Sequence, residues 1–176
     1  PGLFRVAVKR RGAYALNRTW SIAPGNDTPW EGRPRDSLDG FSLPGFTLDE
    51  TPERLVISSD KLRVTVHQPL WLEWHYRDDS GQWQFLTSDR PTSAYLINAH
   101  GDGVAHYQRR QKDDHYYGLG EKAGDLERTG RRFEMRTLDA MGYNAASTDP
   151  LYKHIPFTIT RREQVSFGLF YDNLSS

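Results

Sequence analysis

Short runs in which apolar and polar side chains alternate recur along this chain, and turn residues separate them. A period of two is typical of a β-strand, because successive side chains point to opposite faces. The alternating runs cover residues 3–10, 14–22, 62–68, 70–76, 155–160 and 165–172. No segment has a helical period of useful length. Regular turns between short alternating strands predict an all-β fold, an antiparallel β-sandwich.

The segments between these runs carry turn signals. Residues 77–83 predict a hairpin turn in which Gly81 can take a positive φ. Residues 100–107 predict a turn followed by a strand, and the polar run 161–164 predicts the turn of a late hairpin. Residues 24–53 contain five prolines and are expected to be loop-like.

Length and composition indicate a single domain and argue against nucleic-acid binding, membrane spans and disulfides. A chain of 176 residues suits one domain, so we expect residues 1–176 to form a single domain. The 23 basic and 23 acidic side chains cancel, which argues against a nucleic-acid partner. No apolar run is long enough to span a membrane. The absence of cysteine excludes disulfides and favours a cytoplasmic location, and the Pro1 start suggests that the true start is missing.

The stretch "HYYGLGEKAGDLERTGRR", residues 115–132, has the glycine content of a phosphate-binding loop but not its spacing. Gly118 and Gly120 fit the first part of a dinucleotide-binding pattern, but the next glycine, Gly124, comes one residue late. No helical pattern follows that could direct a dipole at a phosphate. We therefore predict no nucleotide cofactor, and we interpret the stretch as a turn between strands in which glycines permit tight backbone geometry.

Residues that could carry other chemistry form no local motif. No metal site is predicted, because none of the histidines has ligand spacing. The histidines are at 67, 75, 100, 106, 115 and 154. No nucleophile elbow is present either. The carboxylates crowding the last third are Glu121, Asp125, Glu127, Asp139, Asp149 and Asp172. Glycoside hydrolysis needs two carboxyl groups that flank one bond, and sequence clustering does not establish that geometry.

Aromatic side chains suggest sugar stacking as a further option. Trp71, Trp74, Tyr76, Trp83 and Tyr95 could form a platform if they shared one exposed face. Trp71 and Trp74 are three positions apart and so face opposite sides of one strand. At least one of them is therefore expected in the core.

Several motifs in order make the last third resemble a known family. They run from "YYGLGEKAGDLERTGRRFEMRTLDAMGYNAASTDPLYKHIPFTIT", residues 116–160, to "FGLFYDN", residues 167–173, and "GVAHYQRR", residues 103–110, precedes them. This region closely resembles the N-terminal domain of glycoside hydrolase family 31, which includes α-glucosidases and α-xylosidases. The resemblance covers residues 103–173, and the first hundred residues fit as generic strands of the same domain.

The resemblance implies a galactose mutarotase-like β-sandwich that packs against a (β/α)₈ catalytic barrel. In the family the barrel supplies the nucleophile and the general acid/base, and nothing in this chain matches the nucleophile motif. We therefore assign no catalytic residue here and expect the isolated chain to lack hydrolase activity. Related domains continue past the "FGLFYDN" strand, so we expect the sandwich to be truncated at its C-terminal end.

The same resemblance implies which residues meet the substrate, an α-glycoside or oligosaccharide. Asp139, in "RTLDAMGYN", is expected to contact sugar hydroxyls, and Tyr143 and Asn144 are expected to line the aglycone side of the pocket. A carboxylate suits this role because it can accept two charge-assisted hydrogen bonds. A turn-capping role for Asp139 stays open. The segment 149–153 is interpreted as structural, and Glu121 and Arg128 as interface or network groups.

Two other functions stay open. The chain could be a freestanding carbohydrate-binding sandwich, which would bind sugar without a barrel. It could also be an aldose mutarotase, suggested by fold analogy alone. Mutarotation needs a histidine and a carboxylate that act as acid and base on an open sheet face, and no sequence pattern marks such a pair.

Overall fold

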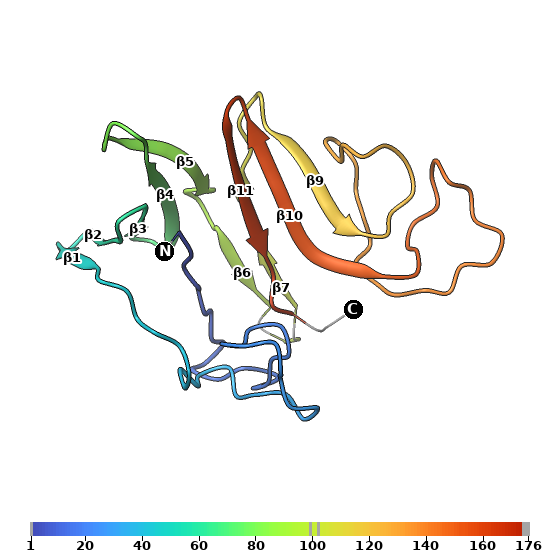
Figure 1. Ribbon diagram of the computed structural model, residues 1–176, viewed down its shortest axis with the longest axis horizontal. Coiled ribbons are helices and arrows are strands. Elements are labelled where there is room, and N and C mark those ends of the chain that lie inside the picture. The colour runs from blue at the N-terminus through green and yellow to red at the C-terminus, as the bar shows by residue number, and fades with distance from the viewer. Residues whose placement is uncertain (1, 99, 102, 174–176) are drawn as a thin grey trace. The chain divides into compact units, whose positions relative to one another are not determined.

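The computed structural model describes residues 2–98, 100–101 and 103–173 (Figure 1). All regular secondary structure in these residues is β-strand, and every strand pairing is antiparallel, which confirms the predicted fold class. The strands are β1 (Thr47–Glu50), β2 (Arg54–Ser58), β3 (Leu62–His67), β4 (Trp71–Arg77), β5 (Trp83–Asp89), β6 (Tyr95–Ile97), β7 (Val104–His106), β8 (Gln108–Arg109), β9 (His115–Gly120), β10 (His154–Arg162) and β11 (Val165–Phe170).

The chain divides into two compact units, Pro1–Arg110 and Gln111–Ser176. The first unit contains a six-stranded sheet in the order β1-β2-β3-β4-β5-β8 and a two-stranded sheet of β6 and β7. The second unit contains a three-stranded sheet in the order β11-β10-β9. The expectation that residues 1–176 form a single domain stays a prediction.

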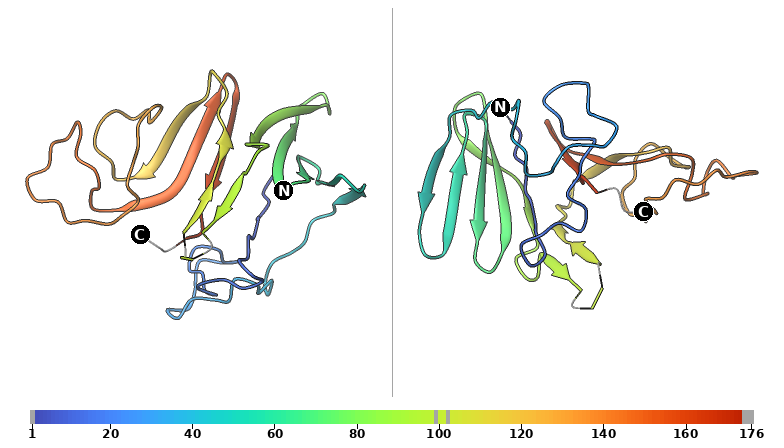
Figure 2. Two further views of the ribbon diagram at one scale, coloured as in Figure 1. Left: turned by 180° about the vertical axis from the view of Figure 1, so that it is seen from behind. Right: turned by 90° about the horizontal axis from the view of Figure 1, so that it is seen from below.

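The first five strands of the six-stranded sheet follow one another as hairpins, as the right-hand view of Figure 2 shows. The predicted strands 62–68 and 70–76 are confirmed as β3 and β4. Their register pairs Val64 with Trp74 and Val66 with Leu72, so apolar side chains share one face of the sheet. Val64 and Leu72 are each only 4% exposed, which places the core of this unit on that face.

The predicted hairpin at 77–83 is also confirmed, as the connection between β4 and β5. Gly81 has a φ of +82°, the conformation for which glycine was expected there. Asp78 fixes the turn, because its Oδ1 accepts hydrogen bonds from the Ser80 and Gln82 main-chain nitrogens at 3.0 and 2.9 Å. The later turn expected within 100–107 includes residue 102, which lies outside the described residues, whereas the strand expected after it is β7.

The two strands predicted nearest the N-terminus are wrong. Residues 3–10 and 14–22 form only isolated bridges, which pair Arg10 with Ala13 and Thr19 with Arg33. An alternating run becomes a strand only when a neighbouring strand accepts its hydrogen bonds and its apolar face is covered. No strand pairs with 3–9 among the described residues, and the apolar face is covered only at Phe4, which packs on Trp74, while Val6 and Val8 are exposed. The loop expected over 24–53 is interrupted at its end by β1.

The second unit begins with β9, which corrects the prediction that residues 115–132 form only a turn. Gly118 and Gly120 belong to this strand and have φ values of +103° and +82°. A Cβ atom on Gly118 would lie 2.5 Å from the Phe157 carbonyl oxygen of β10. Glycine is needed here because the backbones of two strands approach closely, not because the chain reverses. The late hairpin is confirmed as β10 and β11, with the register Arg162 to Val165 at its turn.

Candidate functional site: the loop between β9 and β10

Residues 121–153 form one long loop that leaves the sheet after β9 and returns at β10. Figures 1 and 2 show it beyond β9, at the sheet edge opposite β11. Its two ends lie side by side, because Gly120 pairs with His154 and the Glu121 nitrogen donates to the Lys153 carbonyl at 2.9 Å. The loop is therefore closed at its base by strand-like contacts, and all three predicted substrate-binding residues lie on it.

A buried ion pair holds the interior of the loop. The Lys122 side chain is 0% exposed, and its Nζ donates to Asp149 Oδ1 at 3.0 Å and to the Glu134 carbonyl oxygen. Asp149 Oδ2 accepts a hydrogen bond from the Glu134 nitrogen, so one carboxylate joins both halves of the loop. Burying an ammonium group is costly unless it is paired, and Lys122 Nζ has two oxygen acceptors, one of them a carboxylate. This arrangement supports the structural interpretation of 149–153.

Two arginines stabilise the first part of the loop. Arg128 donates to the carbonyls of Lys122 and Ala123 at 3.4 and 3.3 Å, and Arg131 donates to the Ala123 carbonyl at 3.1 Å. Both guanidinium groups also lie over the Phe133 ring, at 5.5 and 4.9 Å from its centroid. Arg128 is thus a network group, as expected. Sequence reasoning missed Lys122 and Arg131, because each lies in a charge-rich stretch where solvated side chains are the usual interpretation.

Asp139 is exposed on the second part of the loop. No described residue donates a hydrogen bond to its carboxylate or forms an ion pair with it. A capping role would require a main-chain nitrogen within hydrogen-bond reach of this carboxylate, so the structure gives that alternative no partner. The main chain beside it is held, since the Leu138 nitrogen donates to the Leu151 carbonyl at 3.4 Å. The carboxylate is therefore available to a ligand.

Tyr143 and Asn144 lie on the same part of the loop but in different settings. The Tyr143 side chain is 49% exposed, and its ring meets the Tyr152 ring edge-on at 6.0 Å. The Tyr152 hydroxyl donates to the Ala140 carbonyl at 3.1 Å, so this aromatic pair also braces the loop. Asn144 Oδ1 accepts from the Ala146 nitrogen at 2.9 Å and so is engaged in a local turn. Sugar binding by either residue stays a prediction.

The aromatic platform considered from the sequence finds no support in the geometry, and Tyr95 lies on β6, in a different sheet from the tryptophans. Trp71 stacks on His67 with ring centroids 3.8 Å apart and planes 4° apart. The Trp83 ring has the guanidinium groups of Arg63 and Arg77 at 4.3 and 4.6 Å from its centroid. These side chains already occupy ring faces that a sugar would need.

One histidine and one carboxylate do come together in the first unit. His106 Nε2 lies 2.8 Å from Asp89 Oδ1, and Asp89 Oδ2 accepts from the Leu72 nitrogen at 3.0 Å. Asp89 is only 1% exposed, and Tyr95 stacks on the His106 ring at 4.7 Å. This pair links β4, β5 and β7, and its carboxylate is closed to solvent. Mutarotase chemistry requires both groups on an open face, so the pair suits a structural role.

Neither a cluster of metal-binding side chains nor a membrane-spanning helix occurs in the part of the chain that the structure describes. No three histidine, aspartate or glutamate side chains gather there as a metal site would require. No helix in the same residues is long and apolar enough to cross a membrane.

One family model and two proteins named alpha-glucosidase match the sequence of this chain. The model of the glycosyl hydrolase 31 N-terminal galactose mutarotase-like domain matches residues 1–176. The chain is 36% identical over 127 residues to alpha-glucosidase 2 of Bacillus thermoamyloliquefaciens, a match that covers 72% of this chain and 16% of that protein. It is 40% identical over 62 residues to an alpha-glucosidase of Saccharolobus solfataricus, covering 35% of this chain and 9% of that protein.

A solved structure of a GH31 enzyme also matches this chain. The GH31 dextranase FjDex31A of Flavobacterium johnsoniae, complexed with glucose, is 30% identical, with a TM-score of 0.57. The match covers 73% of this chain and 15% of the dextranase. The chain therefore spans less than a fifth of the length of each of these three relatives.

Proposed function

Because the chain belongs to the glycosyl hydrolase 31 N-terminal galactose mutarotase-like family, we propose that it lines the substrate pocket of a retaining α-glycosidase. The substrate class is α-glucosides or related α-glycosides. Relatives named alpha-glucosidase and dextranase support this class. The catalytic aspartates belong to a (β/α)₈ barrel that lies outside this chain, which would make the isolated chain inactive.

The observation that carries the proposal is the unpaired carboxylate of Asp139 on a loop with a fixed base. Lys122 and Asp149 hold the loop from inside, and Tyr152 holds the main chain at Ala140. The loop beneath this exposed carboxylate is therefore held in place, although no described residue forms a hydrogen bond or ion pair with the carboxylate itself. Preorganisation of this kind is what a ligand-binding group needs, because the cost of ordering the loop is met before the ligand arrives.

Asp139 would act by orienting the sugar. Its two oxygens accept hydrogen bonds from adjacent hydroxyl groups, and charge makes these bonds stronger than neutral ones. A sugar held in this way presents its glycosidic bond to the barrel carboxylates, which do the chemistry. Tyr143, on the same part of the loop, would contact the aglycone side. Asp139 is thus a binding residue in this proposal and not an acid, base or nucleophile.

The test compares the 176-residue chain with a longer protein that carries it. The chain alone should not cleave a p-nitrophenyl α-glycoside, whereas the longer protein should. In the longer protein, Asp139→Ala should lower kcat/KM by about 100-fold or more, because two charge-assisted bonds are lost. Asp113→Asn is the matched control, since Asp113 is an exposed carboxylate of the same unit outside the loop. Cleavage by the chain alone that disappears on Asp139→Ala would overturn the proposal.

A freestanding carbohydrate-binding module is the second candidate. Isothermal titration of the chain with maltose and isomaltose tests it, and measurable binding without a barrel supports it. The pocket-lining role is tested independently, by the kcat/KM of Asp139→Ala in the longer protein.

A further inference from the structure

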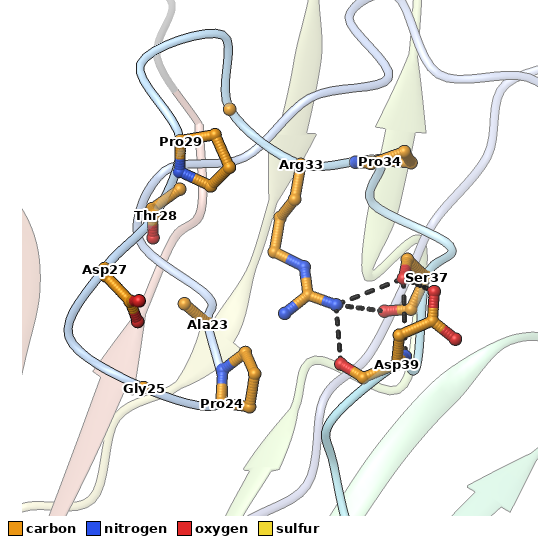
Figure 3. A pocket seen from close by; sticks show the side chains of 11 residues that line it. Ala23, Pro24, Gly25, Asp27, Thr28, Pro29, Arg33, Pro34, Ser37 and Asp39 are labelled. Carbon is orange, nitrogen blue, oxygen red and sulfur yellow. Dashed lines mark hydrogen bonds between the residues drawn. The ribbon is translucent and has the colours of Figure 1, made fainter.

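A hollow of about 330 Å³ lies in the first unit, far from Asp139 along the chain (Figure 3). Its walls come from residues 23–39, a segment without strands. The segment is nevertheless held, because Thr19 and Arg33 exchange two main-chain hydrogen bonds of 2.9 Å. Gly32 packs so tightly on the Trp20 ring that a Cβ atom there would lie 2.8 Å from the ring. The hollow therefore has a defined backbone.

The Arg33 guanidinium is directed into the hollow and is anchored on one side (Figure 3). Its Nη2 donates to Ser37 Oγ at 3.1 Å and to the Asp39 carbonyl at 2.9 Å. Its flat face lies 5.0 Å from the centroid of Phe41. No described residue accepts a hydrogen bond from Nε or Nη1. An arginine that is fixed by one nitrogen and unbonded at the others is a ready donor for a ligand.

Acceptors complete the polar lining. Figure 3 shows the Asp27 carboxylate on the wall that faces Arg33, and no described residue donates a hydrogen bond to it. Asp39 also lines the hollow, but Figure 3 shows its carboxylate turned away from Arg33, where its Oδ2 accepts from Ser37 Oγ at 3.0 Å. One carboxylate, that of Asp27, therefore opposes one guanidinium, and the lining suits a ligand without net charge. A neutral ligand with several hydroxyl groups can both accept from Arg33 and donate to Asp27.

Apolar surface stands beside these polar groups. Pro24, Pro29 and Pro34 line the hollow. Their pyrrolidine rings are apolar, so the hollow combines an apolar wall with a few convergent polar groups, which is the usual make-up of a site for a small ligand.

We propose that this hollow is a second carbohydrate-binding site, which takes one neutral sugar unit. Arg33 donates to the sugar oxygens, Asp27 accepts from its hydroxyls and the lining prolines pack on its ring. The site does not depend on Asp139 or on a catalytic barrel. It would hold a chain of sugars to the protein without cleaving it, and it gives a carbohydrate-binding function a specific place.

The test is a titration of the 176-residue chain with maltose and isomaltose, followed by the amide signals of ¹⁵N-labelled protein. Binding should shift the signals of Gly25, Gly32 and Ser37. Asp27→Asn and Asp27→Ala should each weaken binding by about tenfold, because each removes the charged acceptor of the hollow. Asp27 is exposed, so neither change should unfold the chain, which circular dichroism checks. Asp49→Asn, an exposed carboxylate on β1, is the matched control.

Three results would overturn the proposal. The first is no saturable shift of these signals with either sugar. The second is sugar binding that survives both Asp27→Asn and Asp27→Ala but is lost in Asp139→Ala, which would place the sugar on the loop between β9 and β10 instead. The third is tight binding of inorganic phosphate at the same amides, which would identify an anion site. Loss of binding in the hollow variants with retention in Asp139→Ala supports the second site and leaves the proposed function untouched.

Discussion

The Lys122 ammonium lies 3.0 Å from Asp149 Oδ1, and its side chain has no exposed surface. The two residues are 27 positions apart, at opposite ends of the loop between β9 and β10. The Asp149 side chain is 18% exposed, so the pair is largely shielded from water. Screening by salt is weak at such a site, and the attraction is correspondingly strong. This pair therefore decides whether the loop has one conformation.

Removing the lysine should destabilise the protein and loosen the loop. Lys122→Met leaves the Asp149 carboxylate largely buried without its cation, a change that costs about 3 kcal/mol or more. Urea unfolding followed by tryptophan fluorescence measures the loss. Lys112→Met, at an exposed position of the same unit, should change the free energy of unfolding by about 0.5 kcal/mol at most. Equal effects of the two substitutions would contradict a structural role for the ion pair.

The glycine at position 118 should not tolerate a side chain. Its φ of +103° is unfavourable for alanine, and the added Cβ would meet the Phe157 carbonyl oxygen at 2.5 Å. Gly118→Ala should therefore lower the free energy of unfolding by about 2 kcal/mol, from backbone strain and separation of β9 from β10. Gly130→Ala is the control for strain alone, because Gly130 has a positive φ of 76° but open space around its Cβ position. Thermal melting that ranks the two equally would argue against the close strand contact.

The turn between β4 and β5 should depend on the charge of Asp78. Hydrogen bonds from the side chains of Ser80 and Gln84 and from the Gln82 nitrogen lower the pKa of this carboxyl from 3.8 to about 2. A lowered carboxyl pKa contributes stability that is complete above pH 3.8 and is lost as the pH falls toward 2. Asp78→Ala should thus lower Tm by a few degrees at pH 7, and the difference from the unchanged protein should shrink below pH 3.8. Asp79→Ala, the neighbouring exposed aspartate, should leave Tm nearly unchanged.

Local patterns predicted those strands whose partners lie next to them in the sequence. β3 and β4 alternate clearly, and Gly81 with Asp78 marks the turn that joins β4 to β5. The same alternation at 3–10 failed, because a strand also needs a partner and a covered face, which local pattern does not report. β9 was missed because glycines usually indicate a turn. Here they belong to a strand whose backbone passes close to β10.

Of the candidate site, too, the sequence predicted one part and missed another. Asp139 was predicted from resemblance to a family, and the structure adds that its carboxylate is exposed and without a partner among the described residues. Lys122 and Asp149 could not be paired from sequence, because a contact across 27 residues depends on how the loop folds back. The hollow at 23–39 was missed altogether, since the prolines there indicate only a loop. Its polar lining arises because Asp27 and Arg33 face each other across the hollow.

The His67 imidazole, on the six-stranded sheet, is in a setting that opposes protonation. Its ring stacks on Trp71 at 3.8 Å, and its Nε2 is buried with no hydrogen-bond partner among the described residues. Burial lowers the pKa of this imidazole below its ordinary value of 6.5, nearby Glu73 opposes the shift, and Arg54 adds to it. The folded protein therefore favours the neutral ring.

The stability of the protein should fall as the pH drops below 6.5. In the unfolded chain His67 takes up a proton near its ordinary pKa, whereas in the folded chain it does so only at lower pH, so acid favours unfolding between the two values. Urea unfolding at pH 7.5, 6.5 and 5.5 measures this dependence. His67→Phe keeps an aromatic ring beside Trp71 but cannot titrate, and so should flatten the dependence. His100→Phe, at an exposed histidine, should retain it. A His67→Phe protein with an unchanged pH profile would show that other groups govern the loss in acid.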